Sequence, residues 1–127
     1  MPPYAARVPP PVQPLRLLPG RLVVERGTAD APADGWIALV RAPDGLTVVR
    51  PVRDDEAPAE PWRAFHGEAA HDLDLPGMLL AVLRPLSEAG LPVFVCSTFD
   101  ADLVLVPADR VDEAAGRLRD AGHEVRR

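Results

Sequence analysis

The chain has 127 residues, which is enough for one domain or two very small ones. Hydrophobic residues make up 47% and charged residues 26%, as in ordinary globular proteins, and the net charge is −5. No apolar run approaches the ~20 residues of a membrane-spanning helix, and basic residues never cluster beyond two, so we expect neither membrane insertion nor nucleic-acid binding. The N-terminus does not resemble a signal peptide, and the single Cys96 cannot form an internal disulfide. These features predict a cytoplasmic protein.

Composition divides the chain into three parts. Residues 1–14 are rich in proline, which predicts an extended or disordered segment. Residues 54–61 are acidic and contain two prolines, so they allow at most one helical turn and form the best internal boundary. We therefore predict a first half over residues 15–61 and a second over residues 62–127.

The first half reads as strands and turns. Residues 15–26 are apolar around the break at Pro19–Gly20, which predicts two short strands or one bent strand. Residues 27–35 are small and form a loop. Two apolar runs within residues 36–50 flank the sequence Ala-Pro-Asp-Gly at residues 42–45, and this turn chemistry predicts a hairpin.

The second half begins with a strand and a helix. Aromatic residues and alternation over residues 62–70 predict the strand. From Pro76 to Gly90 the apolar residues recur at helical spacing, with Pro76 suited to the first turn and Gly90 to the end. Pro85 is a defect in this helix, because it removes the hydrogen bond to the carbonyl of Ala81 and should kink the last turn.

A polar hinge interrupts the most apolar stretch of the chain. The runs at residues 93–95 and 103–106 flank residues 97–102, which hold two carboxylates, two hydroxyls and an aromatic ring. This pattern predicts a hairpin whose arms are covered on at least one face. A second amphipathic helix follows over residues 109–121, and residues 123–127 can add a short edge strand. The resulting order, β-α-β-β-α-β, predicts an α+β fold of the ferredoxin-like, split βαβ type with both helices on one face of the sheet.

The sequence of the first half resembles a reduced repeat of the second. A shift of 57 positions lays the hairpin at residues 36–50 over residues 93–107, and Arg53 over Arg110. The sequences after these arginines, Asp-Asp-Glu-Ala and Val-Asp-Glu-Ala, also coincide, whereas the first half lacks the long helix. A reduced internal repeat and a chance similarity of short apolar strands are both open readings.

Three motifs carry a resemblance to a known family: Asp-Leu-Pro-Gly-Met-Leu at residues 74–79, Pro-Leu-Ser-Glu-Ala-Gly at residues 85–90, and Val-Cys-Ser-Thr-Phe-Asp-Ala-Asp-Leu-Val-Leu-Val-Pro at residues 95–107. With them the chain resembles the ACT-domain family, and more narrowly the small tandem-ACT proteins related to the arginine sensors of TOR signalling. The resemblance covers residues 13–127. It implies an ACT domain preceded by a reduced ACT-like half, association as a homodimer, and a regulatory module that binds a small molecule, often an amino acid, between ACT units.

The split βαβ topology places the exit of the first strand, the helix start and the hinge at one end of the sheet. The helix start offers unpaired N–H groups and a positive dipole end for a carboxylate, and Gly77 lets a ligand approach closely. The aspartates suit an ammonium or guanidinium, and Phe99 can wall an apolar group or stack on a cation. The predicted ligand-binding residues are Asp72, Asp74, Leu75, Pro76, Gly77, Met78, Ser97, Thr98, Phe99, Asp100 and Asp102. Asp102 is favoured over Asp100, because the earlier hairpin makes its turn with Gly45 at the equivalent position.

Each of these residues also has a purely structural reading. Asp74 is placed as the N-cap of the helix, the hinge aspartates can bond local backbone, Gly77 can serve helix–sheet packing, and Phe99 can be a core or dimer contact. Cys96 in an apolar strand reads as an inert small hydrophobe.

The leading hypothesis is a non-enzymatic amino-acid-binding protein without cofactor or metal, since the histidines lack ligand spacing and no catalytic motif is present. The alternatives are a structural module of the same fold that only dimerises, and an enzyme that uses Cys96 or the carboxylates.

Overall fold

A computed structural model describes residues 12–68 and 77–127. The elements are β1 (Pro14–Leu17), β2 (Leu22–Arg26), β3 (Ala38–Ala42), β4 (Gly45–Pro51), β5 (Trp62–Gly67), α2 (Met78–Glu88), β6 (Phe94–Ser97), β7 (Asp102–Pro107), a 3-10 turn at Ala108–Arg110, α3 (Val111–Asp120) and β8 (Glu124–Arg126). The predicted α+β class is confirmed: the described residues form one eight-stranded sheet with two α-helices. None of the helices described is long and apolar enough to cross a membrane.

The second half has the predicted element order but gains a strand from the first. β5 pairs antiparallel with β7, which pairs antiparallel with β6, so β5 and β6 are the separated parallel strands of a split βαβ unit. On its other edge β5 pairs with β1, and β8 runs parallel to β1. The strand β1 therefore lies between β5 and β8, where a four-stranded ferredoxin-like sheet would have β8 beside β5.

The proline-rich N-terminal segment ends earlier than predicted. Residues 1–11 lie outside the described residues, but Gln13 is buried and Pro14 begins β1. The bend at Pro19–Gly20 then carries the chain into β2, so the reading of two short strands is the one found, with Gly20 at φ 82°. The division of the chain into the predicted domains stays a prediction.

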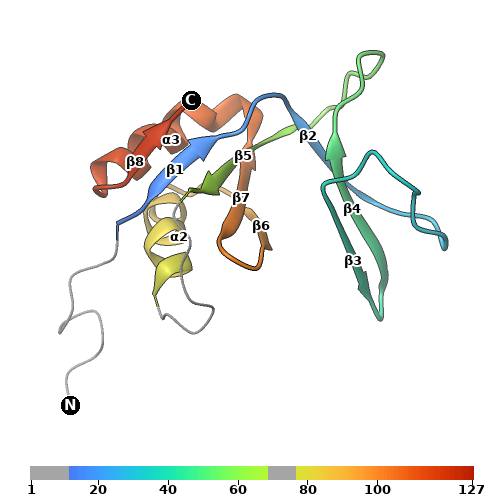
Figure 1. Cartoon of the computed structure of the whole chain (residues 1–127). Coiled ribbons are helices and arrows are strands. Elements are labelled where there is room, and N and C mark those ends of the chain that lie inside the picture. The colour runs from blue at the N-terminus through green and yellow to red at the C-terminus, as the bar shows by residue number, and fades with distance from the viewer. Residues whose placement is uncertain (1–11, 69–76) are drawn as a thin grey trace.

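The first-half hairpin forms as predicted. β3 and β4 pair antiparallel from Ala38–Val49 to Ala42–Gly45, and Gly45 has φ 130°, a value that favours glycine. β4 also pairs with β2, and β2 touches β5 at Leu22–Trp62, which joins the two halves in one sheet. Figure 1 shows this hairpin on the right, away from the two helices on the left.

The side chain of Arg50, with all its N–H groups hydrogen-bonded, joins separate segments of the first half. Arg50 in β4 is only 9% exposed, and its five N–H donors bond both carboxylate oxygens of Glu25, both of Glu56 and the carbonyl oxygen of Pro51. The hydrogen bond from Arg50 is the largest cause of the lowered pKa of Glu56, about 2, and the backbone N–H of Arg53 adds to it. Arg50 therefore ties β4 to β2 and to the predicted boundary segment.

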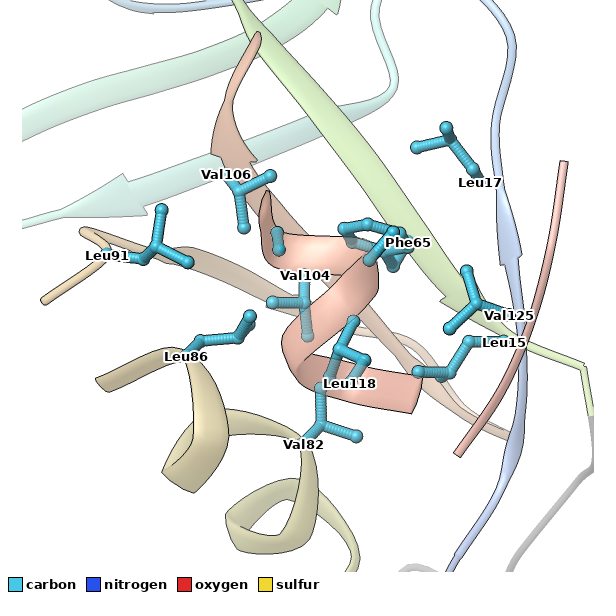
Figure 2. Close-up of a cluster of buried hydrophobic side chains, with 12 residues drawn as sticks. Leu15, Leu17, Phe65, Val82, Leu86, Leu91, Val104, Val106, Leu118 and Val125 are labelled. Carbon is cyan, nitrogen blue, oxygen red and sulfur yellow. The ribbon is translucent and has the colours of Figure 1, made fainter. Parts of the chain in front are cut away.

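The core lies on both faces of the central strands. Facing the helices, a cluster combines side chains of β1, β5, β7, β8, α2 and α3. Figure 2 shows Leu86 of α2 directed toward Val104 of β7, with Val82 of α2 beside Leu118 of α3. The alternate residues of β7, Leu103 and Leu105, pack on the opposite face with side chains of the first half. The prediction of arms covered on at least one face is thus confirmed, and β7 is covered on both.

A glycine with positive φ follows each helix, and Gly90 ends α2 as predicted. Gly90 follows α2 with φ 72° and Gly122 follows α3 with φ 99°. Arg110 donates to the carbonyl oxygens of Ala89 and Gly90, and so caps the C-terminal end of α2 from the start of α3. Its hydrogen bonds with Glu113 raise the pKa of Arg110 and lower that of Glu113.

Candidate functional site

The hinge between β6 and β7 is closed by its own polar groups. The backbone N–H and hydroxyl of Thr98 both donate to the carbonyl oxygen of Ala101, each at 2.8 Å, and the N–H of Ala101 donates back to the Thr98 hydroxyl at 3.0 Å. Ala101 is buried, whereas Phe99 between them is 78% exposed. Thr98 is therefore occupied by the turn, and the ring of Phe99 is open to contact.

Ser97 and Asp102 face each other at the base of the hinge. They are the last pair in the β6–β7 register, and the Ser97 hydroxyl donates to Asp102 Oδ1 at 2.9 Å. The carboxylate favoured for a ligand ammonium thus already accepts a hydrogen bond inside the chain. A ligand cation at this position would share Asp102 with Ser97.

The residue before helix α2 is a glycine, Gly77, whose backbone conformation favours glycine. Gly77 is the N-cap with φ 86° and ψ −5°, a left-handed conformation, and its carbonyl accepts the Ala81 N–H at 3.0 Å. The helix therefore begins at Met78, later than predicted, and the cap position assigned to Asp74 belongs to Gly77. Asp72, Asp74, Leu75 and Pro76 lie outside the described residues.

A chain of contacts joins the helix start to the hinge. The side-chain Nε2 of Gln13 donates to the carbonyl oxygen of Met78 at 3.0 Å. An ideal Cβ on Gly67, the last residue of β5, would lie 3.2 Å from Gln13 Oε1 and 3.3 Å from the Cβ of Ala101. The end of β5, the hinge and the first turn of α2 therefore gather at one end of the sheet (Figure 1).

Two residues at this end escaped the sequence analysis. Gln13 and His123 are both 4% exposed, and the Gln13 N–H donates to His123 Nδ1 at 3.2 Å. Pro85 indicates that such a residue is needed, because a proline in a helix leaves one backbone carbonyl without its helical N–H donor. The local sequence does not identify the donor, because His123 lies 42 positions from Ala81.

The structure gives little support to reactive chemistry elsewhere. Burial raises the pKa of the Cys96 thiol, which disfavours the thiolate needed of a nucleophile. Among the described residues no three His, Cys, Asp or Glu side chains come together as metal ligands. A groove of about 710 Å³ lies beside residues 27–35, but Arg50 at its wall already has all its donors bonded.

Comparison with known proteins gives the class to which this fold and site belong. The ACT-domain family matches residues 59–120, which run from just before β5 to the end of α3. The chain is therefore an ACT-domain protein. A search of curated proteins gave no match.

Solved structures extend the likeness to nearly the whole chain. The crystal structure of protein Atu0741 from Agrobacterium tumefaciens is 32% identical, with a TM-score of 0.76, over 91% of this chain and 92% of that one. The chain belongs to the same family as that protein. VC0802 from Vibrio cholerae, a protein of unknown function, shares the fold at a TM-score of 0.71 with 21% identity, over 84% of this chain and 88% of that one.

Proposed function

We propose that this protein is a non-enzymatic regulator that binds an amino acid at the end of the sheet where α2 begins. The observation that carries the proposal is that Gln13 bonds the Met78 carbonyl while the Gly67 backbone lies close to both Gln13 and Ala101, so the helix start and the hinge lie at the same end of the sheet. A regulatory, ligand-binding role agrees with the ACT domain. The identity of the ligand class is our inference from the chemistry at this end.

The groups gathered there suit a zwitterion. The first turn of a helix presents N–H groups without intrahelical acceptors at the positive end of the dipole, and a ligand carboxylate would bind them. Asp100 and Asp102 supply negative charge for an ammonium or guanidinium group. The exposed ring of Phe99 can cover the ligand side chain or stack on its cation. The predicted Asp72 and Asp74 would add charge from the segment before α2.

We further propose that the first half is a reduced repeat of an ACT unit. Strands β4 and β7 begin 57 positions apart and each is the middle strand of an antiparallel trio. The ion pairs Arg53–Glu56 and Arg110–Glu113 follow these strands at the same spacing. The second half is then a ferredoxin-like ACT unit with β1 inserted, and the arrangement resembles the tandem-ACT arginine sensors of TOR signalling.

A thermal-shift screen of the full chain tests the binding proposal. The twenty amino acids and common metabolites are added at millimolar concentration. A ligand at one hundred times its Kd stabilises by about 2.7 kcal/mol, which for this chain length is roughly 10 °C in Tm. Phe99→Ala and Asp100→Asn should reduce the shift, whereas Val40→Ala, an exposed residue of β3, should retain it. If no compound stabilises the protein, the proposal loses its basis.

A second candidate is a cytoplasmic dimerisation module that binds no ligand. Trp36, Ile37 and Val40 on and before the edge strand β3 are exposed, and an apolar sheet edge is suited to pairing with a second copy. This candidate predicts a homodimer by sedimentation that Trp36→Ser weakens. It also predicts that Asp102→Ala and Gly77→Val leave the association unchanged. A ligand-dependent change in association would favour the first candidate.

A further inference from the structure

Helix α2 contains a carbonyl that the helix itself cannot satisfy. Pro85 lies four residues after Ala81 and has no N–H, so the Ala81 carbonyl oxygen has no intrahelical donor. The His123 ring nitrogen Nε2 lies 2.9 Å from this oxygen. The defect in α2 is therefore repaired by a residue directly before the C-terminal strand β8.

The surroundings of His123 define its tautomer. Its Nδ1 accepts the backbone N–H of Gln13, a group that can only donate, and its Nε2 faces the Ala81 carbonyl, which can only accept. The ring is thus neutral with its proton on Nε2. Both nitrogens are used, as a ring with 4% exposure requires.

Gln13 continues the connection to the first turn of the helix. Its side-chain amide donates to the Met78 carbonyl, and its own carbonyl accepts the Glu124 N–H at 3.3 Å. Its Oε1 lies close to the end of β5, where an added Cβ on Gly67 would meet it at 3.2 Å. Gln13 therefore touches the helix start, β5 and β8 at once.

From this geometry we infer that Gln13 and His123 form a relay that positions the first turn of α2 and couples it to the terminal strand β8. The relay holds α2 at two carbonyls, Met78 and Ala81, three positions apart on one face. β8 has three residues and pairs only with β1 among the described strands. Coupling of this kind is reciprocal: what orders the helix start also orders β8.

This inference extends the proposed function, because the coupled helix start is the proposed ligand site. Its test needs no ligand, so the two can fail separately. Amide hydrogen exchange of the full chain reports Ala81 in α2, whose N–H donates to the Gly77 carbonyl, and Glu124 in β8, whose N–H donates to the Gln13 carbonyl. Two substitutions divide the His123 contacts: His123→Gln keeps an amide donor near Nε2, and His123→Asn keeps an oxygen near Nδ1.

His123→Asn should speed exchange at Ala81 by roughly fivefold, because it leaves a buried carbonyl without a donor. His123→Gln should stay closer to the wild type at Ala81 but lose protection at Glu124. Gln13→Ala should speed both. The matched control is His66→Asn on β5, since no hydrogen bond of the His66 ring is found within the described part of the chain, and it should leave both amides unchanged.

The double variant Gln13→Ala/His123→Asn separates a relay from two independent contacts. In a relay its exchange is no faster than that of the faster single variant, whereas independent contacts multiply their effects. Multiplying effects would overturn the inference, as would unchanged exchange at Ala81 in His123→Asn. Nitrogen NMR gives a direct check, since protonation of Nδ1 in place of Nε2 would also overturn it.

Discussion

Gly77 allows the roles of backbone conformation and ligand approach to be separated. Its φ of 86° is in the left-handed region, which costs an L-residue about 1–2 kcal/mol. Replacing glycine also removes freedom from the unfolded chain, which returns about 0.4–1 kcal/mol. Gly77→Ala should therefore destabilise the protein by roughly 1 kcal/mol net, a fall of a few degrees in Tm.

Gly116 provides a matched control of opposite sign. It lies inside α3, it has no positive φ, and an added Cβ would meet nothing within 4 Å. Gly116→Ala should stabilise the protein by about 0.8–1 kcal/mol, the difference in helix propensity between the two residues. Urea denaturation followed by circular dichroism measures both variants. Equal effects of the two substitutions, or a neutral Gly77→Ala, would refute the reasoning from φ.

Asparagine at position 77 completes the series. Asn tolerates the left-handed region, so Gly77→Asn should cost less stability than Gly77→Ala. It nevertheless places a side chain beside the helix start. If glycine is present to admit a ligand, Gly77→Asn should lose the ligand-induced thermal shift while remaining folded. If glycine serves only the backbone, the shift should persist in proportion to stability.

Two further predictions concern the core and the ion pairs. Leu86→Ala, at a fully buried position of α2, should lower the free energy of unfolding by about 3 kcal/mol in urea denaturation. Leu80 on the same helix is 54% exposed, and Leu80→Ala should lower it by less than about 1 kcal/mol. Similar losses would contradict the assigned faces. Arg50 lowers the pKa of Glu56 from 4.5 to about 2, so Glu56 contributes stability above pH 4.5 that is lost as the pH falls toward 2. The stability difference between wild type and Glu56→Gln should therefore shrink across that window, and a constant difference would argue against the pair.

Local pattern was sufficient for most elements of the fold. The Pro-Asp-Gly turn, the alternation before residue 70 and the helical spacing after Pro76 each depend on neighbours in the sequence, and the structure has a hairpin, a strand and a helix there. The start of α2 differs because Gly77 takes a positive φ as the N-cap, so the helix begins at Met78. The proposed binding residues remain predictions, since their role depends on a ligand.

Local sequence patterns did not predict the polar contacts between residues far apart in the chain. The Gln13–His123 hydrogen bond spans 110 positions, and nothing near Gln13 in a proline-rich segment indicates a buried side chain. The hinge shows the same limit on a smaller scale. Composition placed Ser97, Thr98 and Asp102 together, but the structure shows Thr98 closing the turn and Ser97 donating to Asp102.

The position of β1 between β5 and β8 depends on the same buried polar contacts of Gln13 and His123 that form the relay. Apolar pairing alone does not decide which strand lies beside β5, because Leu15, Leu17 and Val125 all contribute to one core cluster. Polar groups discriminate more sharply, since each buried donor or acceptor left unsatisfied costs about 1–3 kcal/mol. With β8 directly beside β5, Gln13 would lose its place between Met78 and His123, and several buried groups would lose partners together. The hydrogen bonds of the buried amide and imidazole therefore favour the order in which β1 lies between β5 and β8.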